Sequence, residues 1–306
     1  MTAMRQQEWY SAAVSRLADS GCEDAAFDAR CLLEDFGGLA RGHAPDATPL
    51  TKEQAATLAR ALEERAAGHP LQYILGEWDF LTLTLAVGEG VLIPRADTEC
   101  LCEEAARRLA GVNAPRVLDL CAGSGCVGLG LASLCPSAQV TAVELSDKAL
   151  PFLRENVARY PQYAVTVKQA DVLRDADAFD GGFDAILSNP PYIPTADLAG
   201  LMREVQHEPM MALDGDADGL TFYRTIAEQW LPKLADGGVC AVEVGIGQAT
   251  DVAALFATAG LSDIRIVRDL GGVERVVSGI KNKKLNKCSK TLAIWFLMVY
   301  NAVNGS

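Results

Sequence analysis

The sequence lacks paired cysteines and is poor in histidine. Its nine cysteines are scattered among 306 residues without a Cys-x-x-Cys spacing, and its only histidines are His43, His69 and His207. A zinc site or a disulfide framework would show closer or more regular spacing. We therefore expect reduced cysteines, most of them small core residues, and no bound metal.

A long apolar run and an excess of basic charge are also missing. No segment approaches the ~20 apolar residues that cross a bilayer, and the N-terminus has no apolar core of the kind found in signal peptides. The 27 basic side chains are outnumbered by 40 acidic ones, and the resulting net charge of -13 repels phosphate backbones. We expect a cytoplasmic monomer with no membrane contact and no stable nucleic acid partner.

Apolar residues are plentiful and fall into segments of different pattern. They make up 50% of the chain, which suffices for packed cores, and the length favours two domains. We predict an N-terminal helical domain over residues 1–69, a linker with a β-hairpin over 70–97, a second domain over 98–280 and an atypical tail over 281–306.

The first two segments differ in periodicity. Trp9 and Leu17 belong to a set of apolar residues at helical spacing, and Thr51 suits the start of a further helix. Apolar residues then alternate over residues 80–87, before a glycine-rich turn at 88–90. This period of two predicts a strand of a short hairpin that links the two domains.

The second domain alternates between strands and helices. This alternation predicts an α/β fold, namely a doubly wound, Rossmann-like sheet of seven mostly parallel strands with helices on both faces. The strand candidates are residues 116–121, 139–144, 164–169, 183–188, 239–244, 263–268 and 273–278, and helices fit near 125–134, 146–159, 217–235 and 248–259.

A glycine-rich turn follows the first of these strands. Its glycines allow backbone N–H groups at the start of a helix to approach a ligand. Nicotinamide and flavin enzymes use a similar turn, and a purely structural turn is the simpler alternative. The turn therefore indicates a ligand only together with other residues. It consists of Cys121, Ala122, Gly123, Ser124 and Gly125.

Acidic residues end the next two strands. Glu144 can accept hydrogen bonds from both hydroxyls of an adenosine ribose, and Asp171 can accept an adenine amino group, with Val172 beside the ring. Each acid alone could be a solvated loop residue or a helix cap, but their register at successive strand ends favours a bound adenosine. The sequence offers no second glycine turn or basic residues for a pyrophosphate. We therefore predict S-adenosylmethionine as the cofactor, with S-adenosylhomocysteine as the product.

The fourth strand runs into Asn189-Pro190-Pro191-Tyr192, at the sheet edge where α/β enzymes hold their chemistry. The two prolines fix the backbone and leave carbonyl groups as acceptors. A primary amide nitrogen is a weak nucleophile because its lone pair is delocalised, and acceptors that bind its two hydrogens favour the localised form. We predict that the Asn189 side-chain oxygen and the Pro190 carbonyl bind a planar NH2 group, and that the Tyr192 ring packs on its face.

No general base is predicted beside this tetrapeptide. None of the three histidines is obviously placed as a base, and an amide nitrogen that has been methylated is acidic enough to lose its proton to water or a nearby acceptor. The structural alternative is a rigid turn after a strand. The cofactor residues upstream argue for the catalytic interpretation.

At these residues the sequence resembles the HemK-type release factor glutamine methyltransferases. The resemblance implies methyl transfer from S-adenosylmethionine to the side-chain amide nitrogen, N5, of the glutamine in the Gly-Gly-Gln motif of peptide chain release factors, and hence a role in translation termination. It also implies that the helical domain docks the release factor. The resemblance spans residues 4–279 and includes blocks at 70–76 with Phe80, at 91–99, at Glu208-Pro209, at Ala212-Leu213 and at 218–223.

The same resemblance suggests roles for single residues. It places Phe80 with Tyr192 in a pocket for the glutamine side chain. For Arg95 and Glu99, an ion pair that anchors the linker is at least as good an interpretation as a site role. The cofactor contacts that it implies are Gly123, Glu144, Asp171 and Asn189.

The chain departs from the family pattern at several places. Cys121 and Ala122 stand where a glycine and a threonine are usual, Glu144 replaces the commoner aspartate, and Ala96 replaces a proline. The tail over residues 281–306 has no family counterpart, and we interpret it as an appendage rather than as a docked helix or a membrane-surface contact.

Three other functions remain open. An adenine-N6 methyltransferase could use the same tetrapeptide, but it would need a basic surface to hold nucleic acid. A ribosomal-protein glutamine methyltransferase has the same amide chemistry. A non-enzymatic adaptor that binds the cofactor is a third interpretation, which the intact tetrapeptide disfavours.

Overall fold

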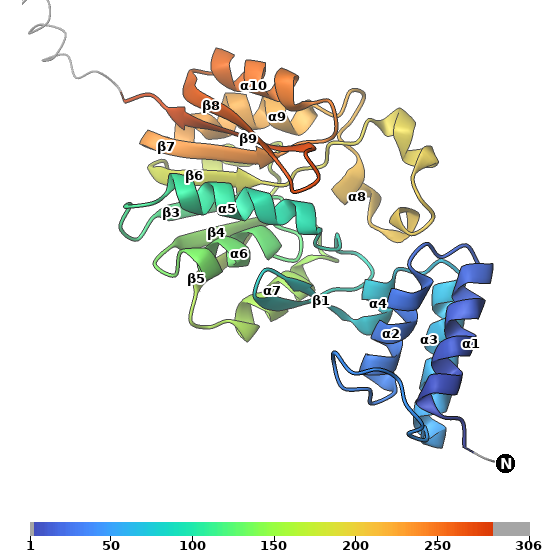
Figure 1. Cartoon of the computed structure of the whole chain (residues 1–306). Coiled ribbons are helices and arrows are strands. Elements are labelled where there is room, and N and C mark those ends of the chain that lie inside the picture. The colour runs from blue at the N-terminus through green and yellow to red at the C-terminus, as the bar shows by residue number, and fades with distance from the viewer. Residues whose placement is uncertain (1–2, 284–306) are drawn as a thin grey trace, which may run out of the picture.

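The computed structural model describes residues 3–283, and its first domain is a bundle of three helices (Figure 1). Trp9, Leu17 and Leu58 are buried in its shared core, because the apolar residues of each helix fall on one face. Thr51 and Gln54 form a capping box in which each side chain accepts the other's backbone N–H, as the predicted helix start requires. The three helices are α1 (Gln6–Asp19), α2 (Ala25–Phe36) and α3 (Lys52–Ala66).

The linker contains the short helix α4 (Leu71–Leu75) and a hairpin of β1 (Glu77–Phe80) and β2 (Leu83–Ala86). The hairpin turns at Leu81, whose φ is 52°. The predicted continuous strand over residues 80–87, with its turn in the glycine-rich segment that follows, is therefore wrong. The apolar alternation continues through the turn, so periodicity alone does not show where the turn lies.

The second domain is built on a seven-stranded sheet in the order β5-β4-β3-β6-β7-β9-β8. The first five strands in this order are parallel, and β9 runs antiparallel to both of its neighbours. The predicted Rossmann-like, mostly parallel sheet is confirmed. The strands are β3 (Arg116–Leu120), β4 (Gln139–Glu144), β5 (Ala164–Gln169), β6 (Phe183–Ser188), β7 (Leu234–Glu243), β8 (Leu261–Arg268) and β9 (Glu274–Lys281).

Three strands, β7, β8 and β9, extend beyond their predicted bounds, and β7 does so most. β7 begins at Leu234 rather than at residue 239, since its pairing with β6 shifts register between Phe183 and Ala185. Gly237 and Gly238 lie in this irregular stretch, and the φ of Gly237 is 86°, a value that glycine adopts without steric cost. The early part of the strand thus carries no apolar alternation by which it could be recognised.

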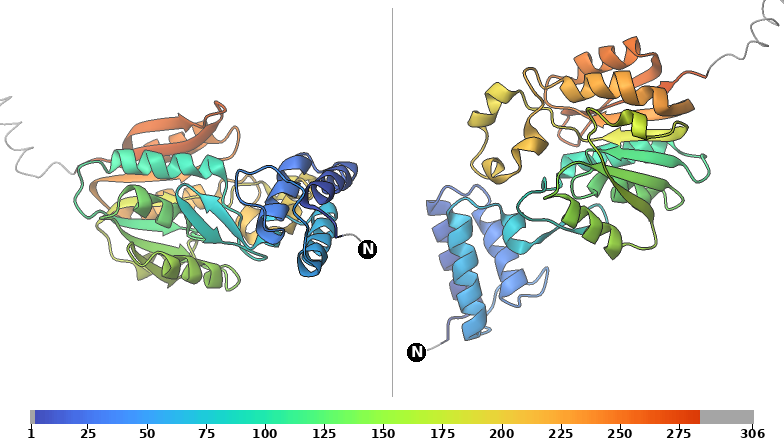
Figure 2. Two further views of the ribbon diagram at one scale, coloured as in Figure 1. Left: turned by 60° about the horizontal axis from the view of Figure 1, so that its bottom comes forward. Right: turned by 180° about the vertical axis from the view of Figure 1, so that it is seen from behind.

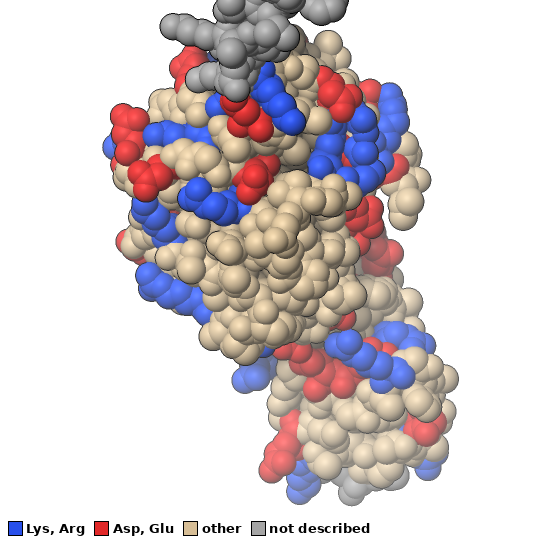
Figure 3. Space-filling view, turned by 90° about the vertical axis from the view of Figure 1, so that its left-hand side faces the viewer, with Lys and Arg blue, Asp and Glu red and all other residues tan. Residues whose placement is uncertain are grey.

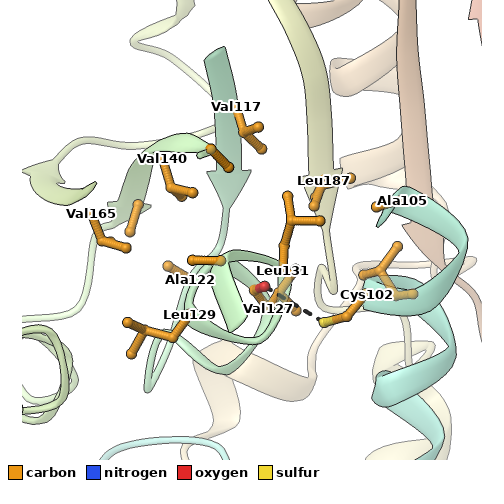
Figure 4. Close-up of a cluster of buried hydrophobic side chains, with 14 of the residues drawn as sticks. Cys102, Ala105, Val117, Ala122, Val127, Leu129, Leu131, Val140, Val165 and Leu187 are labelled. Carbon is orange, nitrogen blue, oxygen red and sulfur yellow. Dashed lines mark hydrogen bonds between the residues drawn. The ribbon is translucent and has the colours of Figure 1, made fainter. Parts of the chain in front are cut away.

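Helices cover both faces of the sheet (Figure 2). On one face, Leu101, Leu131 and Leu153 share a core with the sheet, and Figure 4 shows Cys102 and Ala105 near Leu131 in that core. The helices of this face are α5 (Glu99–Arg108), α6 (Cys126–Leu134) and α7 (Leu150–Arg159).

The opposite face carries the remaining helices, and Tyr223, Trp230 and Phe256 fill its core. The single helix predicted over residues 217–235 is wrong in part. The chain forms three short pieces there, and the last contains Pro232, which has no N–H to continue a helix. The pieces are α9 (Thr221–Thr225), a π-helical turn (Ile226–Trp230) and a 3-10 turn (Leu231–Lys233), and α10 (Ala249–Thr258) lies beside them.

The helical domain contacts the second domain through the long loop after β6, which includes α8 (Met210–Leu213) (Figure 1). Arg65 of α3 is buried and binds both Asp28 of α2 and Glu204 of the loop. The His69 and His207 rings meet edge to face, with centroids 5.1 Å apart. A buried guanidinium with partners on both sides holds the two domains together, since loss of either carboxylate leaves charge uncompensated.

The surface carries charges of both signs. On the face shown in Figure 3, Lys and Arg side chains alternate with Asp and Glu side chains around a large uncharged area. Within residues 3–283, no helix combines the length and the apolar character that crossing a bilayer requires. The predicted tail over residues 281–306 falls outside the described residues from position 284 onward.

Candidate active site

A cavity of about 420 Å³ opens at the carboxyl ends of β3, β4, β5 and β6. Parallel α/β sheets bind ligands at this edge because the strand ends and the helix N-termini converge there. The predicted site residues that line the cavity are Cys121, Ala122, Gly123, Ser124, Glu144, Asp171, Val172, Asn189 and Pro191.

The turn after β3 has the left-handed backbone that its glycines allow. Gly123 has a φ of 55° and Gly125 a φ of 84°, and Cys121 also adopts a positive φ, 59°. Gly125 caps the start of α6 but does not line the cavity. The buried Asn156 amide donates to the carbonyl groups of Ser124 and Ala86. This side chain therefore fastens the turn to the linker hairpin.

Glu144 supports the turn directly. Its Oε2 accepts the Gly123 N–H at 2.8 Å, and its Oε1 accepts the Ser146 N–H at 2.7 Å. Each carboxylate oxygen keeps a further lone pair that can face a ligand in the cavity. The carboxylate thus links the turn after β3 to the end of β4.

Asp171 lies at the next strand end along the cavity. Its Oδ1 accepts the Leu173 N–H at 2.8 Å, and its Oδ2 lies 3.5 Å from the exposed Arg174 guanidinium. Val172, which is buried, and Leu173 also line the cavity. The arrangement places one carboxylate beside apolar side chains, and the adenine contacts of these residues stay a prediction.

The tetrapeptide after β6 meets the start of α5 at this edge of the sheet. Asn189 Nδ2 donates to Thr98 Oγ1 at 3.2 Å, which directs Asn189 Oδ1 away from Thr98. Pro191 lines the cavity, whereas Pro190 and Tyr192 do not. No hydrogen bond among residues 3–283 occupies the Pro190 carbonyl oxygen.

Tyr192 packs toward the protein interior. Its hydroxyl donates to Glu243 Oε1 at 3.4 Å, and its backbone carbonyl accepts the Gln248 side-chain amide at 2.9 Å. Burial and the negative charge of Glu243 raise the pKa of Tyr192. The tyrosine is therefore neutral at physiological pH.

Thr98 and Glu243 were not predicted as site residues. Thr98 is 1% exposed and Glu243 is 2% exposed. Burial raises the pKa of Glu243 to about 7, although hydrogen bonding from Thr98 and the charge of Arg275 lower it in part. Glu243 ends β7, as Glu144 ends β4, so the strand-end rule that identified Glu144 could have found it.

Arg95 and Glu99 do not form the predicted ion pair. Arg95 binds Glu208 of the long loop, while Glu99 Oε1 accepts the Leu81 N–H at 2.8 Å. Glu208 is buried and its Oε2 also accepts the Ile93 N–H at 3.0 Å. The linker is thus anchored by a residue 113 positions away in the chain, and sequence spacing gave no sign of this contact.

Phe80 is not brought to the cavity. Its ring is 1% exposed and lies in the core between the hairpin and α6. A Cβ on Gly130 would lie 2.7 Å from Phe80 Cε1, so the ring fills the space that this glycine leaves. The structure therefore separates Phe80 from Tyr192, and the suggested shared glutamine pocket is not formed by these two side chains.

The sequence of this chain is similar to that of known proteins along most of its length. The family model described as the PrmC N-terminal domain matches residues 8–76, and the one described as the methyltransferase small domain matches residues 98–207. A release factor glutamine methyltransferase of Geobacter sulfurreducens is 42% identical over 266 residues, which cover 86% of this chain and 92% of that protein. One from Caulobacter vibrioides is 38% identical over 289 residues, covering 92% and 98%.

One solved structure is similar to this chain in fold but not in sequence. The hMettl16 catalytic domain in complex with the MAT2A 3'UTR hairpin 6 has a TM-score of 0.57 and 13% identity, and the match covers 85% of this chain and 94% of that chain. A seven-stranded sheet with this strand order and a cavity at its carboxyl edge defines a class I methyltransferase. Within that class, the chain belongs to the release factor glutamine methyltransferases.

Proposed function

We propose that this enzyme transfers a methyl group from S-adenosylmethionine to the side-chain amide nitrogen, N5, of the glutamine in the Gly-Gly-Gln motif of peptide chain release factors. The observation that carries the proposal is the fixed Asn189 amide, whose Nδ2 is bound by Thr98, at the edge of the cavity. The proposal places the enzyme in the cytoplasm, where release factors act, with the helical domain as the docking domain.

The residues that line the cavity support S-adenosylmethionine as the cofactor. Glu144 offers two carboxylate oxygens that each keep a lone pair for ribose hydroxyls, and Asp171 offers an acceptor for the adenine amino group. Ser124 Oγ is buried without a hydrogen bond among the residues that the structure describes, so a polar group of the cofactor would satisfy it. A Cβ on Gly123 would meet only Val91, at 4.0 Å. When bound, the cofactor supplies an electrophilic methyl group on a sulfonium sulfur.

The tetrapeptide would orient the glutamine amide. Asn189 Oδ1 and the Pro190 carbonyl are two acceptors that can bind the two N–H hydrogens of a primary amide. These hydrogen bonds favour the form in which the nitrogen lone pair is localised, and they hold the nitrogen at the cavity edge. We retain Asn189, Pro190 and Tyr192 as proposed catalytic residues, with Pro191 fixing the turn.

Tyr192, the titratable residue of the tetrapeptide, is a poor general base. Tyr192 is neutral because its pKa is raised, and it donates to Glu243. The nitrogen becomes strongly acidic once it carries the additional methyl group, so water or an acceptor at the cavity edge suffices to take the proton.

Mass spectrometry tests the proposal. Release factor incubated with the enzyme and S-adenosylmethionine should gain about 14 Da, the mass of one CH2, on the peptide that contains Gly-Gly-Gln. A release factor in which that glutamine is replaced by asparagine is the matched control and should gain nothing.

The rival activities are tested in parallel. Methylation of adenine in DNA or RNA oligonucleotides without methylation of release factor would favour the nucleic acid interpretation, and methylation of ribosomal proteins instead would favour the other glutamine methyltransferase. Transfer to none of these substrates, with cofactor bound, would favour an adaptor.

A further inference from the structure

Glu243 is a buried carboxyl group that the proposed reaction does not use. It lies at the end of β7, and Val276 of β9 is its partner in the sheet. Its Oε1 accepts the Tyr192 hydroxyl at 3.4 Å, and its Oε2 has no hydrogen bond of ordinary geometry within residues 3–283. A buried acceptor without a donor is costly, so its presence beside the active site calls for a function.

The Thr98 hydroxyl connects this carboxyl group to Asn189. Thr98 Oγ1 already accepts the Asn189 Nδ2 N–H at 3.2 Å, and its own proton remains to be donated. Thr98 is the N-cap of α5, which packs against β7, the strand that Glu243 ends. Hydrogen bonding from Thr98 accordingly lowers the pKa of Glu243. A hydroxyl rotates freely about its C–O bond, so its proton can point to the unpaired Oε2.

The direction of these hydrogen bonds matters because an asparagine amide can be turned over. A carboxylate only accepts hydrogen bonds, and it therefore commits the Thr98 proton to itself. Thr98 Oγ1 is then left only as an acceptor, and the Asn189 group that faces it must be the NH2. If Thr98 were free to donate toward Asn189, the amide could reverse and present its NH2 to the substrate.

We propose that Glu243 is a positioning residue that, through Thr98, fixes the orientation of the Asn189 amide so that Oδ1 faces the substrate. This inference rests on the proposed function, because only an NH2 substrate needs an acceptor at that point. Two donors, the Asn189 NH2 and the substrate NH2, would otherwise meet and repel.

Other charged groups around Glu243 are compatible with an anionic carboxylate. Arg275 of β9 lowers the pKa of Glu243, whereas Asp97 beside Thr98 raises it. Asp97 and Arg275 form an ion pair at 2.8 Å, which balances their charges. The Tyr192 hydroxyl donates to Glu243, and the Tyr223 hydroxyl donates to the Glu243 backbone carbonyl at 2.8 Å. The thiols of Cys102, which is buried, and of Cys126, which is half-buried, have raised pKa values and stay neutral.

The test uses two isosteric substitutions and one conservative control in the full-length enzyme. Glu243→Gln replaces the pure acceptor by a group that can donate to Thr98, and Thr98→Val removes the hydroxyl. Each should lower kcat for release factor methylation on the order of 100-fold, as expected for a misplaced reacting group, with little change in KM. Thr98→Ser keeps the hydroxyl and should retain wild-type kcat.

Two further measurements separate positioning from a merely structural role. The double variant Thr98→Val/Glu243→Gln should lose no more activity than the more affected single variant, because the two residues act in one chain of hydrogen bonds. The wild-type kcat should rise with pH as Glu243 ionises near its pKa of about 7, and Glu243→Gln should lack this rise. Thermal unfolding and cofactor titration of each variant check that the fold and cofactor binding remain.

An NMR measurement gives a result that does not depend on activity. In the wild-type enzyme, the Asn189 side-chain NH2 protons should show a nuclear Overhauser contact to the Thr98 methyl group, and Glu243→Gln should weaken it. An unchanged contact, or wild-type kcat in Glu243→Gln, would overturn the inference. A wild-type enzyme that shows this contact but does not methylate release factor would instead overturn the proposed function.

Discussion

The cavity has two sides that are built in different ways. On the cofactor side, Glu144 reaches Gly123 over 21 positions of the chain, between neighbouring parallel strands. On the substrate side, Asn189 meets Thr98 over 91 positions and Tyr192 meets Glu243 over 51. On the first side, a side chain binds the backbone across two adjacent strand ends. On the second side, side chains bind one another across the ends of the adjacent strands β6 and β7, and Thr98 at the start of α5 joins them from outside the sheet. The cofactor side is therefore a property of the fold, and the substrate side a property of the packing between its parts.

Each side contains one buried carboxyl group whose pKa burial raises to about 7. Asp119 lies below the glycine-rich turn and accepts the Gly128 N–H at 2.8 Å, while Glu243 lies below the tetrapeptide. Asp119 accepts its hydrogen bond from a backbone N–H, whereas Glu243 accepts one from the side chain of Tyr192 in the tetrapeptide. We therefore expect changes at Asp119 to alter stability and changes at Glu243 to alter turnover.

The largest expected effect is on the substrate side. Asn189→Ala removes the acceptor proposed for the substrate amide, and kcat/KM for release factor methylation should fall about 10³-fold, equivalent to roughly 4 kcal/mol. Steady-state kinetics with purified release factor measure it. An Asn189→Ala enzyme with wild-type kcat/KM would show that the proposed amide binding is wrong.

The next effect is on stability. The pKa of Asp119 is raised from 3.8 to about 7 in the folded protein, so the native state keeps a proton that the unfolded state loses. Its contribution to stability is full below about pH 4 and is lost as the pH rises to about 7. Asp119→Asn should remove this loss, which is on the order of 4 kcal/mol.

Urea unfolding of wild type and Asp119→Asn at pH 4 and pH 8 measures the difference. The free energy of unfolding of the variant, taken relative to that of wild type, should be higher at pH 8 than at pH 4. An equal difference at both pH values would mean that Asp119 titrates normally in the folded protein.

Cofactor affinity should respond to Glu144. Glu144→Gln keeps the shape but removes the charge and one acceptor, and S-adenosylmethionine should bind about 10-fold more weakly, since a hydrogen bond to a charged group contributes roughly 1.5 kcal/mol or more. kcat at saturating cofactor should change little, in contrast to Asn189→Ala. Isothermal titration calorimetry measures the affinity, and Glu144→Asp, which keeps the carboxylate, is the control.

The smallest expected effect concerns Cys121. Its φ of 59° costs a residue with a Cβ about 1 kcal/mol or more relative to glycine. Cys121→Gly should therefore be more stable than Cys121→Ala by about that amount, because the two variants differ only in the Cβ. Thermal unfolding of the pair decides, and equal stability would show that the turn relaxes around the side chain.

Much of the second domain could be predicted because its signals are local. The buried strand before Cys121 and the strand ends at Glu144 and Asp171 follow from short runs of residues, and parallel pairing then brings them to one edge. The hairpin was misplaced because alternation alone does not locate a turn at Leu81. β7 was shortened because its first residues pair across a bulge.

The substrate side resisted prediction for a different reason. Phe80 carries no local sign that Gly130, 50 positions on, would leave room for its ring. Glu208 carries none that it would bind Arg95. Such contacts depend on side chains that meet only after the linker and the long loop have packed on the sheet.

The sequence by itself determined the fold class, the glycine-rich turn and the place of the tetrapeptide at a strand end, because periodicity, glycine placement and strand-end residues are encoded in contiguous segments. Only the tertiary structure decided which polar groups surround that tetrapeptide. Thr98 precedes α5 and Glu243 ends β7, the neighbour of β6, so only the packing of α5 and the pairing of these strands bring both residues near the tetrapeptide.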